Sequence, residues 1–453
     1  MRILAAVLVL LAAAAGIVFL VAGRAEQPVI SIEQPLKVVG FDGNLEVTAS
    51  APGGRFDLLE VSVEQEGQRT TLFSLAAPGQ AEVRQDSEDR LRVRRPFGKR
   101  SVPELEAGRA RIDVTAVRSV LFGLRQVSAS ASREVEVRLT PPRISVLSTH
   151  HYINHAGSEM VVYTVSPPEA ESGVRVGDVV YPGYPGSGAG LAGGAGLRVA
   201  FFALLHDQDL DTPVHVFAQD DAGNESRASF DYRVFPKRFR QGRIELDDKF
   251  LSKVVPAILE QAPEITPSGD MLKDFLEING KLRQLNADKI ASLAKESRPE
   301  MLWRDAFRPL TNASIESGFA DRRAYYYGGR EVDRQVHLGF DLAVTVNIPV
   351  LAANAGKVVF AGYLGIYGNT VIVDHGMGVQ SLYAHLASID VAAGDDVAKE
   401  QQLGRSGMTG LAGGDHLHFA MLVAGHPVNP VEWWDPHWIE DRVLRKLREA
   451  GAH

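Results

Sequence analysis

Apolar and polar residues alternate with a period of two in short runs through the first third of the chain. Examples are Val29-Ile-Ser-Ile32, Leu59-Glu-Val-Ser-Val63 and Val135-Glu-Val-Arg-Leu139. Successive side chains of a strand point to opposite faces of a sheet, so this alternation predicts half-buried antiparallel strands. Because Thr140-Pro-Pro-Arg143 then breaks the pattern, we expect a β-sandwich module over residues 26–141.

A second set of strand-like runs follows this break. It includes Val161-Val-Tyr-Thr-Val165, Val199-Ala-Phe-Phe-Ala203 and Val214-His-Val-Phe-Ala218. The segment Asp220-Asp-Ala-Gly-Asn224 predicts a turn, and it resembles the turn before the last strand of many bacterial immunoglobulin-like modules. We therefore expect a second, immunoglobulin-like β-sandwich over residues 142–236.

Beyond residue 236 the pattern changes to helical spacing. Apolar stripes predict helices over residues 247–260, 268–279 and 288–295, with Ser268 and Asp288 as expected N-caps. We interpret residues 237–300 as a helical linker region that packs between domains. A final amphipathic helix is predicted over residues 438–449, and we expect it to pack back on the sheet of the last domain. We assign the end of this helix to a separate C-terminal segment, residues 441–453.

The N-terminus carries the longest apolar run. Residues 3–23 contain no charged side chain and lie between Arg2 and Arg24. About 20 apolar residues span a bilayer, so we interpret residues 1–25 as a transmembrane signal anchor. A cleaved signal peptide is the alternative, for which Ala22-Gly-Arg-Ala25 offers only a poor site. Either reading places the bulk of the chain outside the cytoplasm, and the anchor places it on the periplasmic side of the inner membrane.

The chemistry is concentrated in the last third of the chain. His337 and Asp341 lie four positions apart in an extended segment, and His416 and His418 lie two apart, so each pair shares one face of a strand. His385 lies between them in Tyr383-Ala-His385. Catalytic zinc sites use three protein ligands of the imidazole and carboxylate type and keep a fourth position open. Two histidines and one aspartate of this group meet that description.

Many short motifs from residue 312 to residue 434 resemble those of the lysostaphin-type (LytM-like) zinc endopeptidases. They are Ser314-Ile-Glu-Ser-Gly-Phe319, His337-Leu-Gly-Phe-Asp341, Pro349-Val-Leu-Ala352, Gly356-Lys-Val-Val-Phe360, Tyr367-Gly-Asn-Thr370, Asp374-His-Gly376, Leu382-Tyr-Ala-His-Leu386, Gly404, His416-Leu-His-Phe419 and Pro427-Val-Asn-Pro430. The resemblance implies a compact antiparallel β-sheet peptidase domain, which we place at residues 301–440, with a groove between loops.

The resemblance also implies a role for each residue of the group. His337, Asp341 and His418 are the expected ligands of one zinc ion per chain, while His385 and His416 flank the water and the substrate carbonyl. The chain has no His-Glu-x-x-His motif, so an imidazole must act as the base. We assign His416 as the base and His385 as the group that orients water or stabilises the oxyanion, and the reverse order stays open. Arg322, Arg323 and the run from Tyr325 to Tyr327 are expected on a loop that walls the groove.

Composition narrows the function classes. A net charge of -8 in 453 residues argues against general binding of nucleic acid or anionic lipid. The absence of cysteine excludes disulfides, thiolate metal sites and a lipid-modified N-terminal Cys. We expect an envelope-anchored zinc endopeptidase that cuts peptide bonds of peptidoglycan. The alternatives are a non-catalytic relative that binds cell wall and activates an amidase, and an adhesive scaffold. The sandwiches or residues 247–295 are expected to recruit an envelope protein or to cover the groove.

Overall fold

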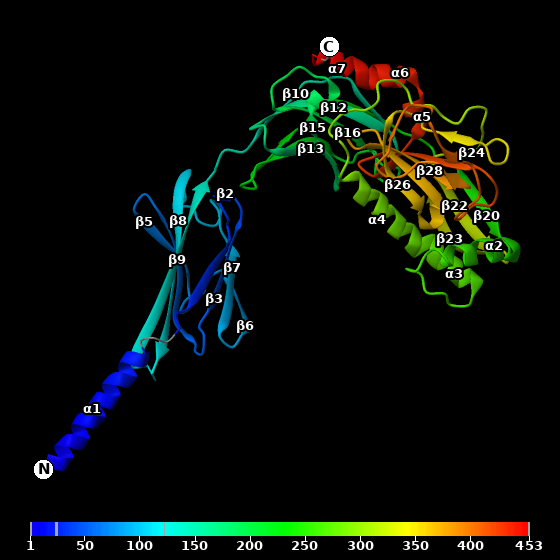
Figure 1. Cartoon of the computed structure of the whole chain (residues 1–453). Helices are drawn as coiled ribbons and strands as arrows, with labels where there is room; N and C mark the ends of the chain where they lie inside the picture. Colours follow the sequence, from blue (N-terminus) through cyan, green and yellow to red (C-terminus); the bar gives the residue numbers. More distant parts are fainter. Residues whose placement is uncertain (1, 23–25, 122, 452–453) are drawn as a thin grey trace. The chain divides into compact units, whose positions relative to one another are not determined.

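The computed structural model describes residues 2–22, 26–121 and 123–451 of the chain, which is mainly β (Figure 1). It divides into two compact units. The first comprises Met1–Pro142 with Gln219–Ser226, and the second comprises Arg143–Ala218 with Arg227–His453. The prediction of a mainly β chain with several sheets is confirmed.

The N-terminal apolar run forms helix α1 (Arg2–Ala22). Within the residues that the structure describes, however, no helix is found that has both the length and the apolar character needed to cross a membrane. The expected transmembrane helix is therefore not supported. The alternative cleavage site, Ala22-Gly-Arg-Ala25, falls mostly on residues 23–25, which lie outside the described residues.

The first unit contains a sandwich of two antiparallel-rich sheets. In spatial order, one sheet contains β1 (Val29–Gln34), β3 (Asn44–Ser50), β7 (Arg90–Pro96) and β6 (Glu82–Ser87). The other contains β2 (Val38–Val39), β9 (Arg125–Val137), β8 (Gly108–Val120), β4 (Phe56–Gln65) and β5 (Gln68–Ser74). The sequence alternation explains the packing. Ile112, Val114 and Ala116 of β8 are buried in the core, while Asp113 and Thr115 between them are only half-buried.

A second sandwich opens the second unit, and a parallel pair of strands accompanies it. The strands are, in spatial order, β10 (Arg143–Val146), β12 (Ser158–Ser166), β16 (Leu197–Ala203) and β15 (Tyr184–Pro185) in one sheet, β14 (Val179–Pro182), β13 (Glu171–Val176), β17 (Val214–Gln219) and β18 (Glu225–Ala228) in the other, and β11 (His151–Asn154) beside β19 (Tyr232–Phe235) in the pair. A short 3-10 helix η1 (Gly186–Ala189) connects β15 and β16.

A large antiparallel sheet forms the centre of the C-terminal region. Its order is β21 (Ser314–Ser317), β24 (Phe340–Ala343), β32 (Leu417–Val423), β28 (Val379–Leu386), β27 (Asn369–Asp374), β26 (Gly356–Tyr363) and β30 (Asp396–Val397), with β33 (His426–Val428) paired to β32. A smaller sheet holds β25 (Pro349–Leu351), β31 (Gln402–Arg405) and β29 (Ser388–Ile389), and η3 (Gly365–Tyr367) precedes β27. Strands β28 and β32 are buried along their whole length. The middle of the sheet is therefore a rigid scaffold that fixes the positions of the side chains it carries.

The helical region joins this sheet through a third, small sheet. Strand β20 (Gln241–Leu246) pairs in parallel with β22 (Asp321–Tyr327), which pairs antiparallel with β23 (Arg330–His337). The helices that follow β20 are α2 (Asp248–Leu259), α3 (Met271–Glu277), the π-helix η2 (Ile278–Leu282) and α4 (Arg283–Ala294).

The expected caps of this region are wrong. Asp270, not Ser268, caps α3, because its carboxylate accepts hydrogen bonds from the backbone N–H groups of Leu272 and Lys273. Asp288 lies inside α4, since η2 joins α3 and α4 without a break and no second N-terminus is formed. The expected loop of Arg322 to Tyr327 is strand β22.

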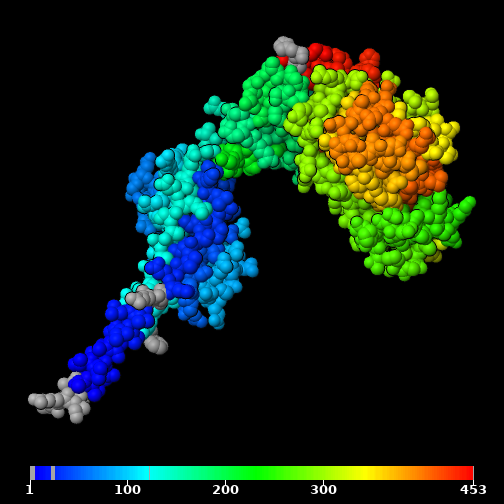
Figure 2. All heavy atoms as spheres, viewed as in Figure 1, coloured from blue at the N-terminus to red at the C-terminus, as the bar shows by residue number. Residues whose placement is uncertain are grey.

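The C-terminal helices pack on the second sandwich. Helices α5 (Pro430–Trp434), α6 (Pro436–Ile439), η4 (Glu440–Leu444) and α7 (Arg445–Glu449) follow one another almost without interruption, and Figure 2 shows their red surface against the green surface of the sandwich. Lys446 of α7 donates to Glu159 Oε1 of β12 over 2.7 Å, and both side chains are at most 1% exposed. The helix expected to pack on the sheet of its own domain therefore contacts strand β12 of the sandwich.

An aromatic cluster joins the second sandwich to the C-terminal sheet region. The ring of Trp303 lies 6.0 Å from that of Phe201 in β16 and 5.6 Å from that of Trp433 in α5. Beside it the buried Glu432 carboxylate accepts hydrogen bonds of 2.7 Å from Asn154 Nδ2 and from the Ser158 backbone N–H. The sandwich and the C-terminal domain thus share one continuous core.

We expect Lys446→Met to lower the stability of the second unit by about 3–5 kcal/mol, because it removes the hydrogen-bonded counter-ion of the buried Glu159 carboxylate and leaves only Arg442, 4.0 Å away. The measurement is urea unfolding followed by tryptophan fluorescence. All four tryptophans of the chain lie between residues 303 and 438, so the signal reports this unit.

Arg445→Met is the matched control on the same helix. Its ion pair with Asp441 is 3.2 Å long, but the arginine side chain is 41% exposed, so its loss should cost at most about 1 kcal/mol. Equal shifts of the two unfolding midpoints would contradict a structural role for the buried pair.

Candidate metal centre and active site

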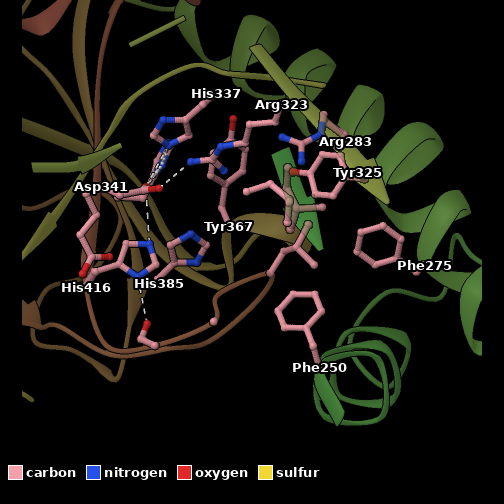
Figure 3. Close-up of a pocket in the computed structure, with 17 residues that line it drawn as sticks. Phe250, Phe275, Arg283, Arg323, Tyr325, His337, Asp341, Tyr367, His385 and His416 are labelled. Atoms are coloured by element: carbon pink, nitrogen blue, oxygen red, sulfur yellow. Dashed lines mark hydrogen bonds and ion pairs between the residues drawn. The ribbon is translucent and has the colours of Figure 1, made fainter. Parts of the chain in front are cut away.

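Neighbouring strands bring the five predicted site residues together (Figure 3). His337 ends β23, Asp341 lies in β24 and His418 lies in β32, where it is the register partner of Asp341. His385 lies near the end of β28, on the other side of β32, and His416 precedes β32 in an isolated bridge to Gly407. All five are buried and line one cavity.

Three of these residues form a compact group of possible metal ligands. His337 Nε2 lies 2.9 Å from Asp341 Oδ1 and 3.0 Å from His418 Nδ1, and His418 Nδ1 lies 3.0 Å from Asp341 Oδ1. These are the three residues whose ligand atoms gather closely enough to hold an ion within the described part of the chain. The set matches the expected ligands His337, Asp341 and His418.

The atoms of this group that face one another are hydrogen-bond acceptors, and a bound cation would satisfy them better than they satisfy one another. His337 Nδ1 lies 3.0 Å from the carbonyl oxygen of Gly318, so it donates its proton there and leaves a lone pair on Nε2. Asp341 Oδ1 is also an acceptor. A proton on one atom of the group satisfies a single neighbour, whereas a divalent cation satisfies all three atoms at once. Two imidazole nitrogens and one carboxylate oxygen are typical zinc ligands.

Gly339 makes room for the His418 ring. A Cβ atom at this position would lie 2.5 Å from His418 Nε2 and 2.8 Å from the carbonyl oxygen of Phe419. Neither contact is tolerable, because the imidazole is fixed by its neighbours and the carbonyl belongs to a central strand. The glycine of the His337-Leu-Gly-Phe-Asp341 motif is therefore required by the close approach of His418.

Arg323 holds the second oxygen of Asp341. Its Nη2 donates to Asp341 Oδ2 over 2.9 Å, while Oδ1 faces the histidines. Burial alone would raise the pKa of Asp341, but the adjacent imidazoles of His337, His416 and His418 hold it well below its usual range. The carboxylate is therefore ionised and oriented with a single oxygen toward the ligand group.

His385 and His416 are each fixed through Nδ1. His385 Nδ1 donates to the Thr409 carbonyl over 2.8 Å, and His416 Nδ1 donates to the Gly414 carbonyl over 2.9 Å. Both neutral rings therefore keep an acceptor at Nε2. The rings lie 4.8 Å apart, and His385 has a left-handed backbone with φ of 60°, an unusual conformation that the surrounding sheet enforces.

The environments of the two rings differ. Burial lowers the pKa of His385 to about 3, with smaller contributions from His416 and His418. Burial also lowers the pKa of His416, but the hydrogen bond and the charge of Asp341, whose Oδ1 lies 3.5 Å from His416 Nε2, more than compensate and raise it. His385 is consequently a neutral acceptor, whereas His416 can take a proton and hold it beside a carboxylate.

The cavity, of about 390 Å³, continues from the ligand group to the helical region. Phe250 of α2, Phe275 of α3 and Arg283 of α4 line it together with Arg323 and Tyr325 of β22. We interpreted the helical stripes from the sequence as packing surfaces only, so Phe250, Phe275 and Arg283 were missed. Local sequence carries no signal for them, because the pairing of β20 with β22 that brings them here joins segments about 80 residues apart.

The comparisons with known proteins concern this C-terminal region. The sequence model of the family described as Peptidase family M23 matches residues 335–430. The Peptidoglycan DD-endopeptidase ShyA of Vibrio cholerae serotype O1 is 30% identical over 172 residues, which are 38% of this chain and 37% of that protein. The DD-carboxypeptidase/endopeptidase Mpg of Neisseria meningitidis serogroup B is 41% identical over 97 residues, which are 21% of this chain and 22% of that protein.

The chain thus spans between 22% and 37% of the length of these two curated relatives. Among solved structures, the catalytic domain of lysostaphin from Staphylococcus simulans is 28% identical, with a TM-score of 0.25, over 29% of this chain and 98% of that domain. The resemblance of the motifs to the lysostaphin-type peptidases is confirmed: the C-terminal part of the chain is a peptidase domain of family M23.

Proposed function

We propose that the chain is a zinc metalloendopeptidase that hydrolyses peptide bonds in the stem peptides or cross-links of peptidoglycan. The observation that carries the proposal is the convergence of His337 Nε2, Asp341 Oδ1 and His418 Nδ1 within 3.0 Å of one another in a buried site, beside two further histidines. The name of the relative ShyA, a peptidoglycan DD-endopeptidase, supports the substrate class, and the name of Mpg supports the endopeptidase activity.

The side chains of the site divide the work. His337, Asp341 and His418 hold the zinc ion, which when bound supplies a Lewis acid for water and for the scissile carbonyl. Gly318 and Arg323 orient His337 and Asp341 from behind, through the hydrogen bonds described above. The five site side chains are buried, and the low local dielectric strengthens these electrostatic interactions.

His416 is the proposed general base. It accepts the proton of the attacking water at Nε2, and the imidazolium that forms lies beside Asp341, 3.5 Å away. His385 donates through Nδ1 to Thr409, so its neutral ring can only accept a hydrogen bond at Nε2. That property suits the orientation of water. It does not suit stabilisation of an oxyanion, which requires a donor.

The proposed substrate determines where in the cell the enzyme must act. Peptidoglycan lies outside the cytoplasmic membrane, so the proposal requires export of the domains that follow α1. We also propose that an envelope protein binds the sandwiches. The non-catalytic alternative, a wall-binding protein that activates an amidase, is less well supported, because the chain retains all three ligand residues together with His385 and His416. Mass spectrometry of muropeptides released from purified sacculi by the zinc-loaded protein tests the proposal directly. Specific cleavage products are expected, and intact sacculi would contradict it.

We expect His337→Ala, Asp341→Ala and His418→Ala each to abolish both stoichiometric zinc and activity. Each removes one of three protein ligands, and the affinity should fall by more than the roughly 10–100-fold that loss of an outer-shell partner costs. Metal analysis after gel filtration gives the zinc content. His385→Ala and His416→Ala are the controls, because they should retain zinc. Zinc retained by His418→Ala, or lost from His416→Ala, would show that the ligands are assigned wrongly.

We expect His416→Ala to lower kcat by on the order of 10²–10⁴-fold with zinc retained, as is usual when a general base is removed. His385→Ala should have the smaller effect, since His385 only orients water. Single-turnover hydrolysis of a peptide dimer by both zinc-loaded variants compares them. A larger loss in His385→Ala than in His416→Ala would reverse the two roles.

A further inference from the structure

We infer that Arg283 and Arg323 form a subsite for a free carboxylate of the peptide substrate, so that the enzyme selects acidic over amidated peptides. The inference rests on the proposed peptidase function and adds the substrate class. Both arginines line the same cavity as the ligand group, and Figure 3 shows Arg323 reaching Asp341 with Arg283 on the same side of the cavity. An extended peptide across the ligand group would pass them.

Arg283 is oriented but not neutralised. Its Nε donates to the Asn279 carbonyl over 3.1 Å and its Nη2 donates to Asn279 Oδ1 over 2.6 Å. Asn279 is itself fully buried and donates to Asp333 over 2.7 Å. The guanidinium is therefore held by neutral acceptors, and it forms no ion pair with a carboxylate in the described part of the chain. A planar guanidinium retains donors for a bidentate carboxylate in this arrangement.

Arg323 supplies the second cation. Its carboxylate partner is Asp341, which is also a ligand in the proposed zinc site. When a divalent cation binds Asp341, the negative charge of that carboxylate is shared with the cation. Besides Asp341, Glu316 is the acidic residue among the described residues that line the cavity. The loaded cavity consequently has an excess of positive charge and favours an anionic ligand.

The apolar wall strengthens this preference. Phe250, Phe275, Tyr325 and Ile366 line the cavity beside the two arginines. Charges in such a low-dielectric environment attract more strongly than in water, and a carboxylate bound by a guanidinium forms charge-assisted hydrogen bonds. A carboxamide of the same size cannot supply the charge. The arginines therefore distinguish the free acid from the amide of one and the same peptide.

The test compares two synthetic cross-linked stem-peptide dimers that differ only in whether their free carboxylates are converted to carboxamides. The zinc-loaded full chain should cleave the acid with a kcat/KM about tenfold higher, mostly through KM, as expected for one charge-assisted hydrogen-bonded pair. Direct binding of both dimers, measured by calorimetry, should show the same preference. This second readout does not depend on turnover.

Arg283→Met should reduce the preference to about twofold or less while cleavage of the amide is retained. Arg330→Met is the matched control. Arg330 is an exposed arginine of β23 outside the cavity lining, and its loss should leave the preference unchanged. Should Arg283→Met fail to fold, the acid-to-amide ratio of the unmodified chain decides.

Equal cleavage and equal binding of the two dimers by the unmodified chain would overturn the inference and leave the peptidase proposal intact. Cleavage of neither dimer by the zinc-loaded chain would count against the peptidase proposal. In that case the binding preference alone confirms the carboxylate subsite or overturns it. If Arg283→Met and Arg330→Met showed the same preference for the acid as the unmodified chain, the assignment of the subsite to Arg283 would also be overturned.

Discussion

The active site of the C-terminal domain depends on a buried arrangement in which three potential metal-ligand atoms, each with a lone pair, face one another. His337 Nε2, Asp341 Oδ1 and His418 Nδ1 lie about 3 Å apart, and Asp341 is ionised. Buried polar groups that repel or fail to satisfy one another cost free energy, which a cation recovers on binding. The rigid strands β24 and β32 hold the group in register, and Gly339 allows the close approach. In the proposed function, a bound metal ion would complete the site and offset this cost.

The sequence predicted the site through periodicity and failed where position depends on long-range pairing. The i, i+4 and i, i+2 spacing predicted that each pair shares one face of a strand. The structure brings the four residues together, but His337 and Asp341 lie on two strands, β23 and β24, and His416 precedes β32. Arg323 was expected on a loop, because nothing within residues 321–327 reveals that β20, about 80 residues earlier, adds a parallel strand beside them. Phe275 was interpreted as a packing residue, and Arg283 and Phe250 were not singled out, for the same reason. The prediction of the α3 cap was wrong for a local reason, because Asp270 and Ser268 are both suitable N-cap residues near the same helix start and Asp270 occupies the position.

The sandwich strands were visible for the opposite reason. Their alternation is a local consequence of one buried and one exposed face, so short windows suffice to find them. What the pattern could not show is that the second sandwich has no separate core. Trp303, Phe201 and Trp433 pack together across it and the peptidase domain, and Lys446 and Glu432 place hydrogen-bonded charges in the same interface. A chain cut at residue 301 would expose this aromatic surface.

The same energetics bear on whether the helical region opens and closes the groove. Leu251, Val255 and Ile258 of α2 are buried in a core that also contains Tyr325 of β22 and Ile366 of η3. Full exposure of each such side chain costs about 1.5–3 kcal/mol, so lifting the helices away costs more than the roughly 1–3 kcal/mol that typical allosteric coupling provides. The helices are therefore better understood as a fixed wall of the cavity than as a lid. Control of activity, where the chain has it, then depends on substrate selection at that wall or on recruitment by the sandwiches, and neither requires the core to open.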